Sequence, residues 1–544
     1  MRTIVIFLLL VLTTMGTKAQ ITERARPKGW DKLVNGGRFM DRFLPMPDLG
    51  GMTANTWGAK NVIPRDINNG IEDPEWSYWG GKVRLLDDGK YHLFVCRWPE
   101  NSPKGHMEWP RSTVVHTVAD NRFGPYKVVA EIGKGHNPEW YISKTGKYVI
   151  YVINGYYVSD DINGKWEYKK FDFDKRDRRI IEGLTNLSFA KREDGSFVMI
   201  CRGGGVWISK DGLSTWNQIS DKRVYPPVDG HFEDPVIWKT NVQYHLIVND
   251  WYGRIAWHLR SKDGVKWKVD AGEAYLPGIA KYKDGTKEDW FKYERIKILQ
   301  DQYGRAIQAN FAVIDTLKHE DKPNDNHSSK NIAIPLLKGK LLSVLNKKAI
   351  TNKTKKIELL IRSEPGFDPL NKLDFKTLRF GAPEVVDFGK GSTVKRIKKS
   401  TDGVIVTFDA KLCGFTDDNF AGKLLGKDKN GKLVFGYSRL PGIHYTEAIL
   451  SARKPQIINN GSQLKIEIEN FGQVSSKESK LQVFILHDNE FVEIAETTLQ
   501  AIEPYQKRTL SLNTKFDLTK ADKPEYHIFI NKGKKDEVKN IFKK

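Results

Sequence analysis

The stretch NLSFAKREDGSFVMICR, residues 186–202, has two counterparts in the chain, and their spacing indicates the fold. The counterparts are NPEWYISKTGKYVIYVI (137–153) and DPVIWKTNVQYHLIVND (234–250), so that the three starts are 49 and 48 residues apart. A second signal repeats in step: VSDDINGKW, ISKDGLSTW and RSKDGVKW end at Trp166, Trp216 and Trp267, which are 50 and 51 residues apart. Two signals that share one period indicate tandem structural units.

Each unit shows the same order of features. A short strand opens with Asn or Asp, a turn such as KTGK or EDGS follows, and an aliphatic and aromatic strand comes next. A third strand ends in Ser-Asp-Gly turn chemistry, and a Trp begins a fourth strand. Four antiparallel strands in about fifty residues are typical of one blade of a β-propeller.

Two diverged copies flank these units. DPEWSYWGGKVRLLDDGKYHLFVCRW (73–98) opens the series, and ERIKILQDQYGRAIQANFAVID (294–315) with IELLIRSEPGF (357–367) closes it. The sequence therefore predicts an all-β chain in which residues 20–54 form an N-terminal extension and residues 55–380 form a five-bladed β-propeller. Beyond the propeller we expect a linking β-module over 381–454, and then a β-sandwich over 455–544, where apolar and polar residues alternate.

The first nineteen residues have the features of a signal peptide. Arg2 precedes the apolar run TIVIFLLLVLTTMG, and TKAQ offers a cleavage site after Ala19. An uncleaved anchor is the alternative. No later segment has about 18 unbroken apolar residues, so we expect an exported, periplasmic or secreted chain without a membrane span in its mature form. The three cysteines do not suit a disulfide framework and lack metal-ligand spacing.

The chain is strongly basic, with a formal net charge of +21, and 11% of its residues are aromatic. Since no nucleic-acid motif is present, an acidic polysaccharide is the expected partner for this charge. A solvated lysine-rich surface is the alternative explanation.

The motifs GHNPEW (135–140), FEDPVIW (232–238) and YERIKIL (293–299) resemble the strand-opening motifs of five-bladed β-propeller glycoside hydrolases. That group includes families 43, 32, 62 and 117, and the likeness is to unassigned members related to families 43 and 117. Ile296 stands where such members often have Pro. The C-terminal sandwich is similar to their adhesion-type accessory modules. The resemblance implies exo-acting release of a terminal sugar from a plant or algal oligosaccharide, by inversion. The basic charge and the arginines add the expectation of an acidic or sulfated sugar.

The first strand of each propeller blade lines the central axis, so we expect the residues that open these strands to surround one pocket. They are Asp73, Asn137, Asn186, Asp234 and Glu294. The resemblance makes Asp73 the general base and Asp234 the acid that orients the substrate. For inversion, two such carboxyl groups stand about 6.5–9.5 Å apart. The alternative is that Asp-Pro merely begins a strand.

The sequence leaves the proton donor open among four residues. Glu182, followed by Gly183, partly matches the Glu-Gly-Pro setting of family 43, and His327 matches the His donor of members related to family 117. Glu294 and Glu233 are further candidates. Because neighbouring side chains on a strand point to opposite faces, Glu233 is expected to point away from Asp234 unless the strand is bulged.

Further side chains are expected to bind the substrate. These are His136, His231, Arg97, Arg202, Arg295 and Trp140. We expect no cofactor and read no metal site from ligand spacing, although a structural cation on the axis stays open. Two other functions remain open. The second candidate is a glycan-binding propeller without catalysis, and the third is a polysaccharide lyase.

Overall fold

The computed structural model describes residues 26–52, 66–250, 254–288, 290–323, 325, 327, 329–487, 490–516, 518 and 524–542. The predicted signal peptide lies outside the described residues. Strands dominate the described segments, and the helices there have only three to seven residues. None of these helices has the length and hydrophobicity needed to span a lipid bilayer. The three cysteines are buried and form no disulfide.

Residues 76–335 form five separate sheets, each built mainly from antiparallel strands that are consecutive in sequence. The first sheet holds β1 (Trp76–Leu85), β2 (Tyr91–Pro99), β3 (Thr113–Ala119) and β4 (Lys127–Lys134). The second holds β5 (Glu139–Ile142), β6 (Tyr148–Val152), β7 (Gly155–Ser159) and β8 (Glu167–Lys169). The third holds β10 (Ser188–Lys191), β11 (Phe197–Ile200), β12 (Val206–Ser209) and β13 (Trp216–Gln218), and β9 (Phe173–Asp174) joins it in parallel to β13. The fourth holds β14 (Glu233–Lys239), β15 (Tyr244–Asp250), β16 (Ile255–Ser261) and β17 (Lys268–Tyr275). The fifth has three strands, β18 (Lys292–Gln300), β19 (Ala306–Ile314) and β20 (Ser329–Pro335).

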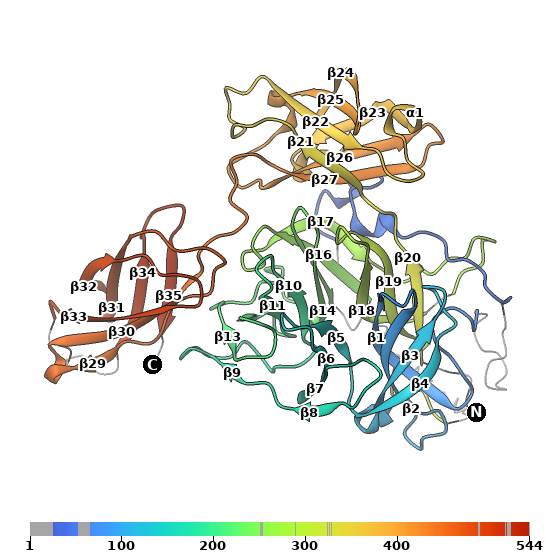
Figure 1. The fold of residues 1–544 in the computed structure, drawn as a ribbon, viewed down its shortest axis with the longest axis horizontal. Coiled ribbons are helices and arrows are strands. Elements are labelled where there is room, and N and C mark those ends of the chain that lie inside the picture. Colours follow the sequence, from blue (N-terminus) through green and yellow to red (C-terminus); the bar gives the residue numbers. More distant parts are fainter. Residues whose placement is uncertain are drawn as a thin grey trace, which may run out of the picture.

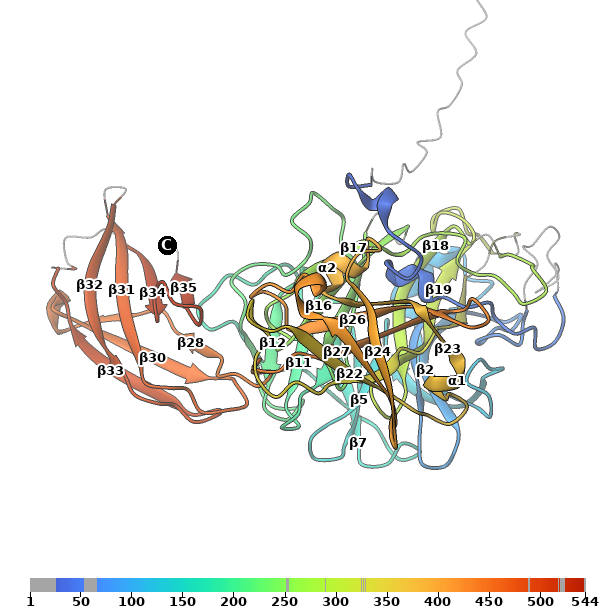
Figure 2. The same ribbon diagram turned by 90° about the horizontal axis from the view of Figure 1, so that it is seen from above.

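The contacts between the first strands of these sheets close a circle. In order around it, β1 contacts β5, β5 contacts β10, β10 contacts β14, β14 contacts β18, and β18 contacts β1. The labels of these strands gather in one region of Figure 1, and Figure 2 shows the same part of the molecule from above. Aromatic and aliphatic side chains fill the space between neighbouring sheets. Trp79 and Phe94 of the first sheet, for example, share a buried cluster with Trp140 of the second. Burial of these faces holds the sheets together. We call residues 76–335 the five-sheet body.

A closed seven-stranded barrel follows the five-sheet body. Its strands are β21 (Lys340–Val344), β22 (Lys356–Arg362), β23 (Leu373–Gly381), β24 (Ser392–Ser400), β25 (Gly403–Asp409), β26 (Ala421–Asp428) and β27 (Leu433–Arg439). Two short helices, α1 (Pro369–Lys372) and α2 (Pro383–Val386), connect them. The predicted boundary at residue 380 is therefore wrong, because it falls inside the barrel. The segment 357–367, expected in the fifth sheet, begins with β22, whose Ile357, Leu359 and Ile361 point into the barrel core.

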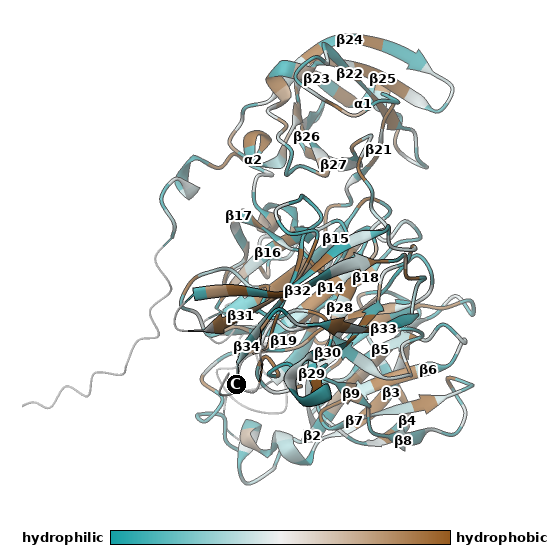
Figure 3. Cartoon of the chain, turned by 90° about the vertical axis from the view of Figure 1, so that its left-hand side faces the viewer, coloured by the Kyte–Doolittle hydropathy of each residue, from teal (hydrophilic) through white to brown (hydrophobic). Residues whose placement is uncertain are grey.

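The last part of the chain is a sandwich of two four-stranded sheets. One sheet holds β28 (Leu450–Ala452), β29 (Gln456–Ile458), β30 (Gln463–Asn470) and β33 (Lys507–Asn513). The other holds β31 (Ser479–His487), β32 (Glu490–Leu499), β34 (Glu525–Ile530) and β35 (Val538–Phe542). Alternate apolar residues from both sheets form the core, and hydrophobic residues lie mainly in strands across the molecule (Figure 3).

The barrel and the sandwich contact different sides of the five-sheet body, as Figure 1 shows. Arg260 of β16 donates to Glu384 of α2 at 3.2 Å, which joins the fourth sheet to the barrel. Arg176, next to the third sheet, donates to the Ser451 carbonyl of the sandwich at 2.9 Å. The N-terminal segment carries the short helices η1 (Trp30–Lys32) and η2 (Phe39–Arg42), and η2 packs against β17 of the five-sheet body.

Candidate functional site

The first strand of each sheet contains, or closely follows, a residue with a left-handed backbone that faces its counterparts in the other sheets. These residues are Gly80, Asn137, Asn186, Asp234 and Arg295, with φ of 68°, 57°, 52°, 52° and 52°. In three sheets the pairing register shifts around them, between Trp79 and Lys82, Glu233 and Val236, and Glu294 and Lys297. Gly, Asn and Asp tolerate this conformation best. The recurrence of Asn and Asp at strand starts thus has a backbone cause, because both residues tolerate the left-handed conformation that each of these positions adopts.

The five residues with left-handed backbone form a ring. Asn137 Nδ2 donates to Asn186 Oδ1 at 3.4 Å, and Asn186 Nδ2 donates to Asp234 Oδ1 at 3.1 Å. Arg295 donates to Asp234 from its backbone N–H at 3.1 Å and also from Nη1. A Cβ on Gly80 would lie 3.7 Å from Asn137 Cα and 3.9 Å from Arg295 Cβ, so Gly80 closes the ring. We call these residues the axial ring.

Asp234 uses its carboxylate fully within this ring. Asn249 Nδ2 adds a bond to Oδ2 at 2.8 Å, so four donors from three residues other than Asp234 itself surround the carboxylate. The residue is only 3% exposed. Asp234 therefore holds the ring together, because its carboxylate accepts from donors of the third, fourth and fifth sheets.

Three carboxylates meet beside the axial ring. Oxygen atoms of Glu233, Asp234 and Glu294 lie within 4.8 Å of one another. The strand is bulged at Asp234, which is the exception stated for Glu233 above, and the two neighbouring carboxylates therefore lie together. The Glu233 side chain is 21% exposed, whereas those of Asp234 and Glu294 are almost completely buried. Glu233 is thus the member of this carboxylate cluster that solvent reaches.

Positive charges face each member of the carboxylate cluster. Arg202 Nη2 donates to Glu233 Oε1 at 2.5 Å, and Lys318 Nζ donates to Glu294 Oε2 at 2.5 Å. Lys292 Nζ lies 3.9 Å from Glu294 Oε1. Burial raises the pKa of Glu233, the charge of Asp234 raises it further, and Arg295 partly offsets this. The raised pKa makes Glu233 a carboxyl group suited to proton transfer.

The carboxylate cluster does not suit a resident divalent cation. Carboxylate oxygens are the ligands that Ca²⁺ and Mg²⁺ prefer. Here, however, three acids are matched by the two arginines Arg202 and Arg295 and by Lys292 and Lys318. A divalent cation would have to displace these ion pairs.

Two buried histidines, His106 between β2 and β3 and His136 just before β5, lie close enough to Lys318 and Arg295 to experience their charges. His136 Nδ1 is 3.0 Å from Ser112 Oγ, and His106 Nδ1 is 2.7 Å from Ser329 Oγ. Burial lowers the pKa of both histidines well below the ordinary value, with the charge of Lys318 adding to the effect. They are therefore neutral hydrogen-bonding groups at physiological pH.

A second layer of charge lies two residues beyond the axial ring along three of the strands. Lys82 Nζ donates to Glu139 Oε1 at 2.6 Å, and Lys297 pairs with the other oxygen of Glu139. Burial alone would raise the pKa of Glu139, but Lys297 and Lys82 hold it below the usual value. These ion pairs join the first, second and fifth sheets beneath the axial ring.

The structure places several expected residues elsewhere. Gly80, not Asp73, occupies the ring position of the first sheet, so that prediction is wrong. Asp73 Oδ1 accepts from Glu75 N at 3.0 Å within its own turn, and Oδ2 accepts from the Tyr78 hydroxyl. These two bonds hold Asp73 in its turn, which agrees with the alternative that Asp-Pro merely begins a strand.

In the fifth sheet the ring residue is Arg295, and the expected residue Glu294 lies one position earlier.

Two of the other candidate proton donors, Glu182 and His327, do not join the carboxylate cluster. Glu182 is exposed, with φ of 56°, and no described residue pairs with its carboxylate. His327 Nδ1 lies 3.5 Å from Asp315 Oδ1. Within the described residues, no hydrogen bond or ion pair joins Glu182 or His327 to Glu233, Asp234 or Glu294. The geometry therefore favours Glu233 over Glu182 and His327 as the candidate proton donor.

Of three further residues expected to bind the substrate, the structure excludes only Trp140 from contact with a sugar. Trp140 is fully buried, donates to the Lys82 carbonyl at 2.6 Å, and cannot stack on a sugar. Arg97 lies over the Trp76 ring at 3.9 Å. His231 is exposed, and its backbone N–H donates to Asp250 at 2.8 Å. Only Arg202 and Arg295 of the expected arginines contact the carboxylate cluster.

Residues missed from the sequence include His106, Lys292 and Lys318. His106 belongs to the short helix η3 (Gly105–Arg111), and Lys318 lies between β19 and β20. Both belong to insertions between strands, where the period of the repeat carries no information. A signal in the sequence could have found one further set of residues. Lys82, Glu139 and Lys297 each stand two positions after a residue of the axial ring, so they share one position in the repeat.

No protein-family model matches the chain, and no curated protein matches it. Among solved structures, the periplasmic gluconolactonase of Pseudomonas aeruginosa is similar at 11% identity, over 82% of this chain and 91% of that chain, with a TM-score of 0.15. A TM-score of this size does not establish a common fold, and it gives no information on activity.

Proposed function

We propose that this chain is an exported, exo-acting glycoside hydrolase that removes a terminal sugar from plant or algal polysaccharide oligomers. We further propose that the five sheets are the blades of a five-bladed β-propeller whose axis passes through the axial ring. The observation that carries the proposal is the carboxylate cluster, in which Glu233 combines a raised pKa with partial exposure. Export rests on the sequence of the first nineteen residues.

Glu233 is the proposed proton donor. Such a donor works best when its pKa lies near the working pH, and burial next to other acids is a known way to raise a carboxyl pKa. Glu294 is the proposed second carboxylate, faced by Lys318 and Lys292. Its side chain is only 2% exposed, so Lys318 must move aside when a sugar enters. Asp234 positions both through the axial ring.

The separation of the carboxylates bears on the stereochemical course. Carboxyl groups stand about 5–5.5 Å apart in retaining enzymes and about 6.5–9.5 Å apart in inverting ones. Oxygen atoms of Glu233 and Glu294 lie within 4.8 Å, which favours retention. Inversion, expected for Asp73 with Asp234, would need a base from outside this cluster. The anomer formed first, followed by NMR, distinguishes the two courses.

The charge near the cluster favours an acidic or sulfated sugar. Arg202 is 45% exposed and Lys318 is 26% exposed, so both present positive charge at the site. The formal net charge of +21 adds long-range attraction for a polyanion.

Glycan binding without catalysis is the second candidate. The observation that favours it is the bonding of Asp73 and Asp234, because the two acids expected to act are both held by protein donors. A lyase comes third.

Product release from a panel of neutral and sulfated plant and algal oligosaccharides tests the proposal. We expect a monosaccharide from wild type and a loss of at least about 100-fold for Glu233→Gln. Glu182→Gln is the matched control, since this exposed glutamate has no partner among the described residues, and we expect full activity. An unsaturated product that absorbs in the ultraviolet would indicate a lyase. Binding without product, unchanged in Glu233→Gln, would indicate the second candidate.

A further inference from the structure

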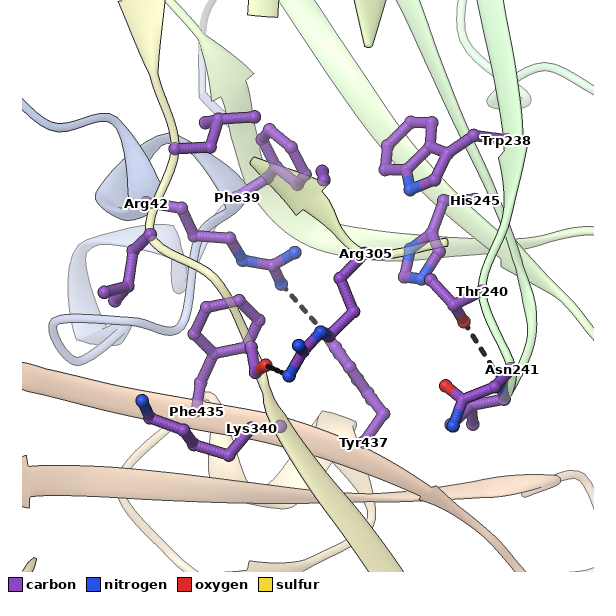
Figure 4. Close-up of a pocket in the computed structure, with 16 residues that line it drawn as sticks. Phe39, Arg42, Trp238, Thr240, Asn241, His245, Arg305, Lys340, Phe435 and Tyr437 are labelled. Carbon is purple, nitrogen blue, oxygen red and sulfur yellow. Dashed lines mark hydrogen bonds between the residues drawn. The ribbon is translucent and has the colours of Figure 1, made fainter. Parts of the chain in front are cut away.

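A small cavity lies where the N-terminal segment, the five-sheet body and the barrel meet (Figure 4). Helix η2, the turns after β14 and β18, the segment before β21, and β27 all contribute to its wall. Its volume is about 50 Å³, several times the space that one water needs. Asn241, which lines the cavity, is exposed to solvent.

Arg42 is the charged group that this cavity leaves without a counter-charge. The residue is 6% exposed, and its guanidinium lies 4.6 Å from the Phe39 ring centroid and 4.3 Å from that of Phe435. Nη2 donates to the Tyr437 hydroxyl at 3.0 Å, whereas Nε is buried without a partner. In the part of the chain that the structure describes, no carboxylate pairs with Arg42.

The neighbouring titratable groups do not supply the missing charge. Arg305, which shares the cavity wall, already binds Asp301 and Glu364. Lys340 Nζ lies over the Phe367 ring at 3.7 Å and adds positive charge.

His245 is the remaining titratable group of the wall, and it is neutral. Its Nδ1 is 3.0 Å from His258 Nε2, and His258 Nδ1 is 2.9 Å from Asp270. Burial and the charge of His258 lower the pKa of His245 well below the ordinary value. The wall therefore has an excess of positive charge.

We propose that this cavity binds a small inorganic anion, of the size of chloride, which pairs with Arg42. A buried charge without a counter-ion is costly, and an anion in the adjacent cavity removes that cost. Because η2, the five-sheet body and β27 all line the site, the anion also stabilises the docking of the barrel. Cation–π contacts with Phe39 and Phe435 are the competing explanation for a buried guanidinium.

Thermal unfolding of the full chain at constant ionic strength tests the proposal. Sodium chloride is replaced stepwise by sodium MES, whose anion is too bulky for the cavity. We expect the wild-type unfolding midpoint to rise by on the order of 2 °C with chloride, since a ligand that binds only the folded state stabilises it. Arg42→Leu should lose this chloride dependence. Arg362→Leu, at an exposed arginine of β22, should keep it.

Bromide supplies a second readout that does not depend on a variant folding. Crystals of the wild type grown in sodium bromide should show an anomalous peak beside Arg42. Equal chloride dependence in wild type and Arg42→Leu would overturn the proposal. So would a cavity without bromide in a protein whose midpoint ignores chloride, since the two aromatic rings would then suffice.

Discussion

Arg295 donates to the carboxylate of Asp234 twice, from its backbone N–H to Oδ2 at 3.1 Å and from Nη1 to Oδ1, although the residues are 61 positions apart in different sheets. Both have the same left-handed backbone, with φ of 52°. One ion pair thus ties together the bulges that open the fourth and fifth sheets, and these bulges present Glu233 and Glu294 to each other.

Asp234→Asn should destabilise the chain markedly. The variant leaves the Arg295 guanidinium, whose side chain is 11% exposed, without its counter-charge, and breaking a buried ion pair costs about 3–5 kcal/mol. We expect a lower thermal midpoint together with lost activity. The double variant Asp234→Asn/Arg295→Met should regain part of the midpoint but none of the activity. An unchanged midpoint in Asp234→Asn would contradict the structural role of the ring.

The sequence was sufficient for the all-β class and for the repeated units, because turns and strand-opening residues recur at one period. It also predicted that Asn137, Asn186 and Asp234 lie together, as their hydrogen bonds confirm. The prediction that Asp73 belongs to the ring was wrong, because Gly80 occupies the ring position of the first sheet. Glycine has no side chain from which the sequence could indicate this position. A ring residue that is Gly, Asn, Asp or Arg in different sheets has a common backbone conformation but no common side-chain chemistry.

The sequence made Glu233 a poorer candidate for the proton donor, also because it does not show the backbone conformation. Strict alternation along a strand places Glu233 and Asp234 on opposite faces, and a single bulge reverses that conclusion. The barrel was missed because β22 alternates like any other strand, and alternation does not say which sheet a strand joins. Contacts from inserted segments, such as Lys318 to Glu294, have no repeat to predict them.

Arg202→Gln should shift the alkaline limb of the pH–activity profile to higher pH. A proton donor loses activity as pH rises through its pKa. The positive charge of Arg202 lowers the pKa of Glu233, so its removal raises that pKa further. The profile of initial rates between pH 4 and about 9 measures the shift. Lys222→Gln, at an exposed lysine nearby in sequence, is the control, and an equal shift there would point to a general charge effect.

Asp321→Asn should stabilise the chain at pH 8 and change little at pH 5. Burial, with Glu100 and Asp325 nearby, raises the pKa of Asp321 to about 8. Because the folded state holds this proton more tightly than the unfolded state, stability falls as pH rises from about 4 to 8. Asparagine removes the titration. The difference in thermal midpoint between variant and wild type should therefore grow with pH, and a constant difference would contradict the assignment.

Arg176→Ala should separate the sandwich from the five-sheet body. Its fully buried guanidinium binds Glu469 at 2.8 Å and Ser451 at 2.9–3.0 Å, and it lies over the Phe471 ring at 4.7 Å. Removing it leaves these sandwich groups unsatisfied at the junction. Small-angle X-ray scattering should show a larger radius of gyration, and calorimetry should show a separate sandwich transition.

Arg453→Ala is the matched control for this junction. Arg453 pairs with Asp174 and Asp177 across the same interface and with Glu467 of the sandwich, but its side chain is 31% exposed. Ion pairs that solvent reaches contribute about 0–1 kcal/mol each. We expect an unchanged radius of gyration and one cooperative transition in this variant. If Arg176→Ala behaves in the same way, the sandwich is held by its remaining contacts, such as Arg192 to the Phe471 carbonyl at 2.8 Å. If it separates, retained product release would show that the sandwich is not needed for the chemistry at Glu233.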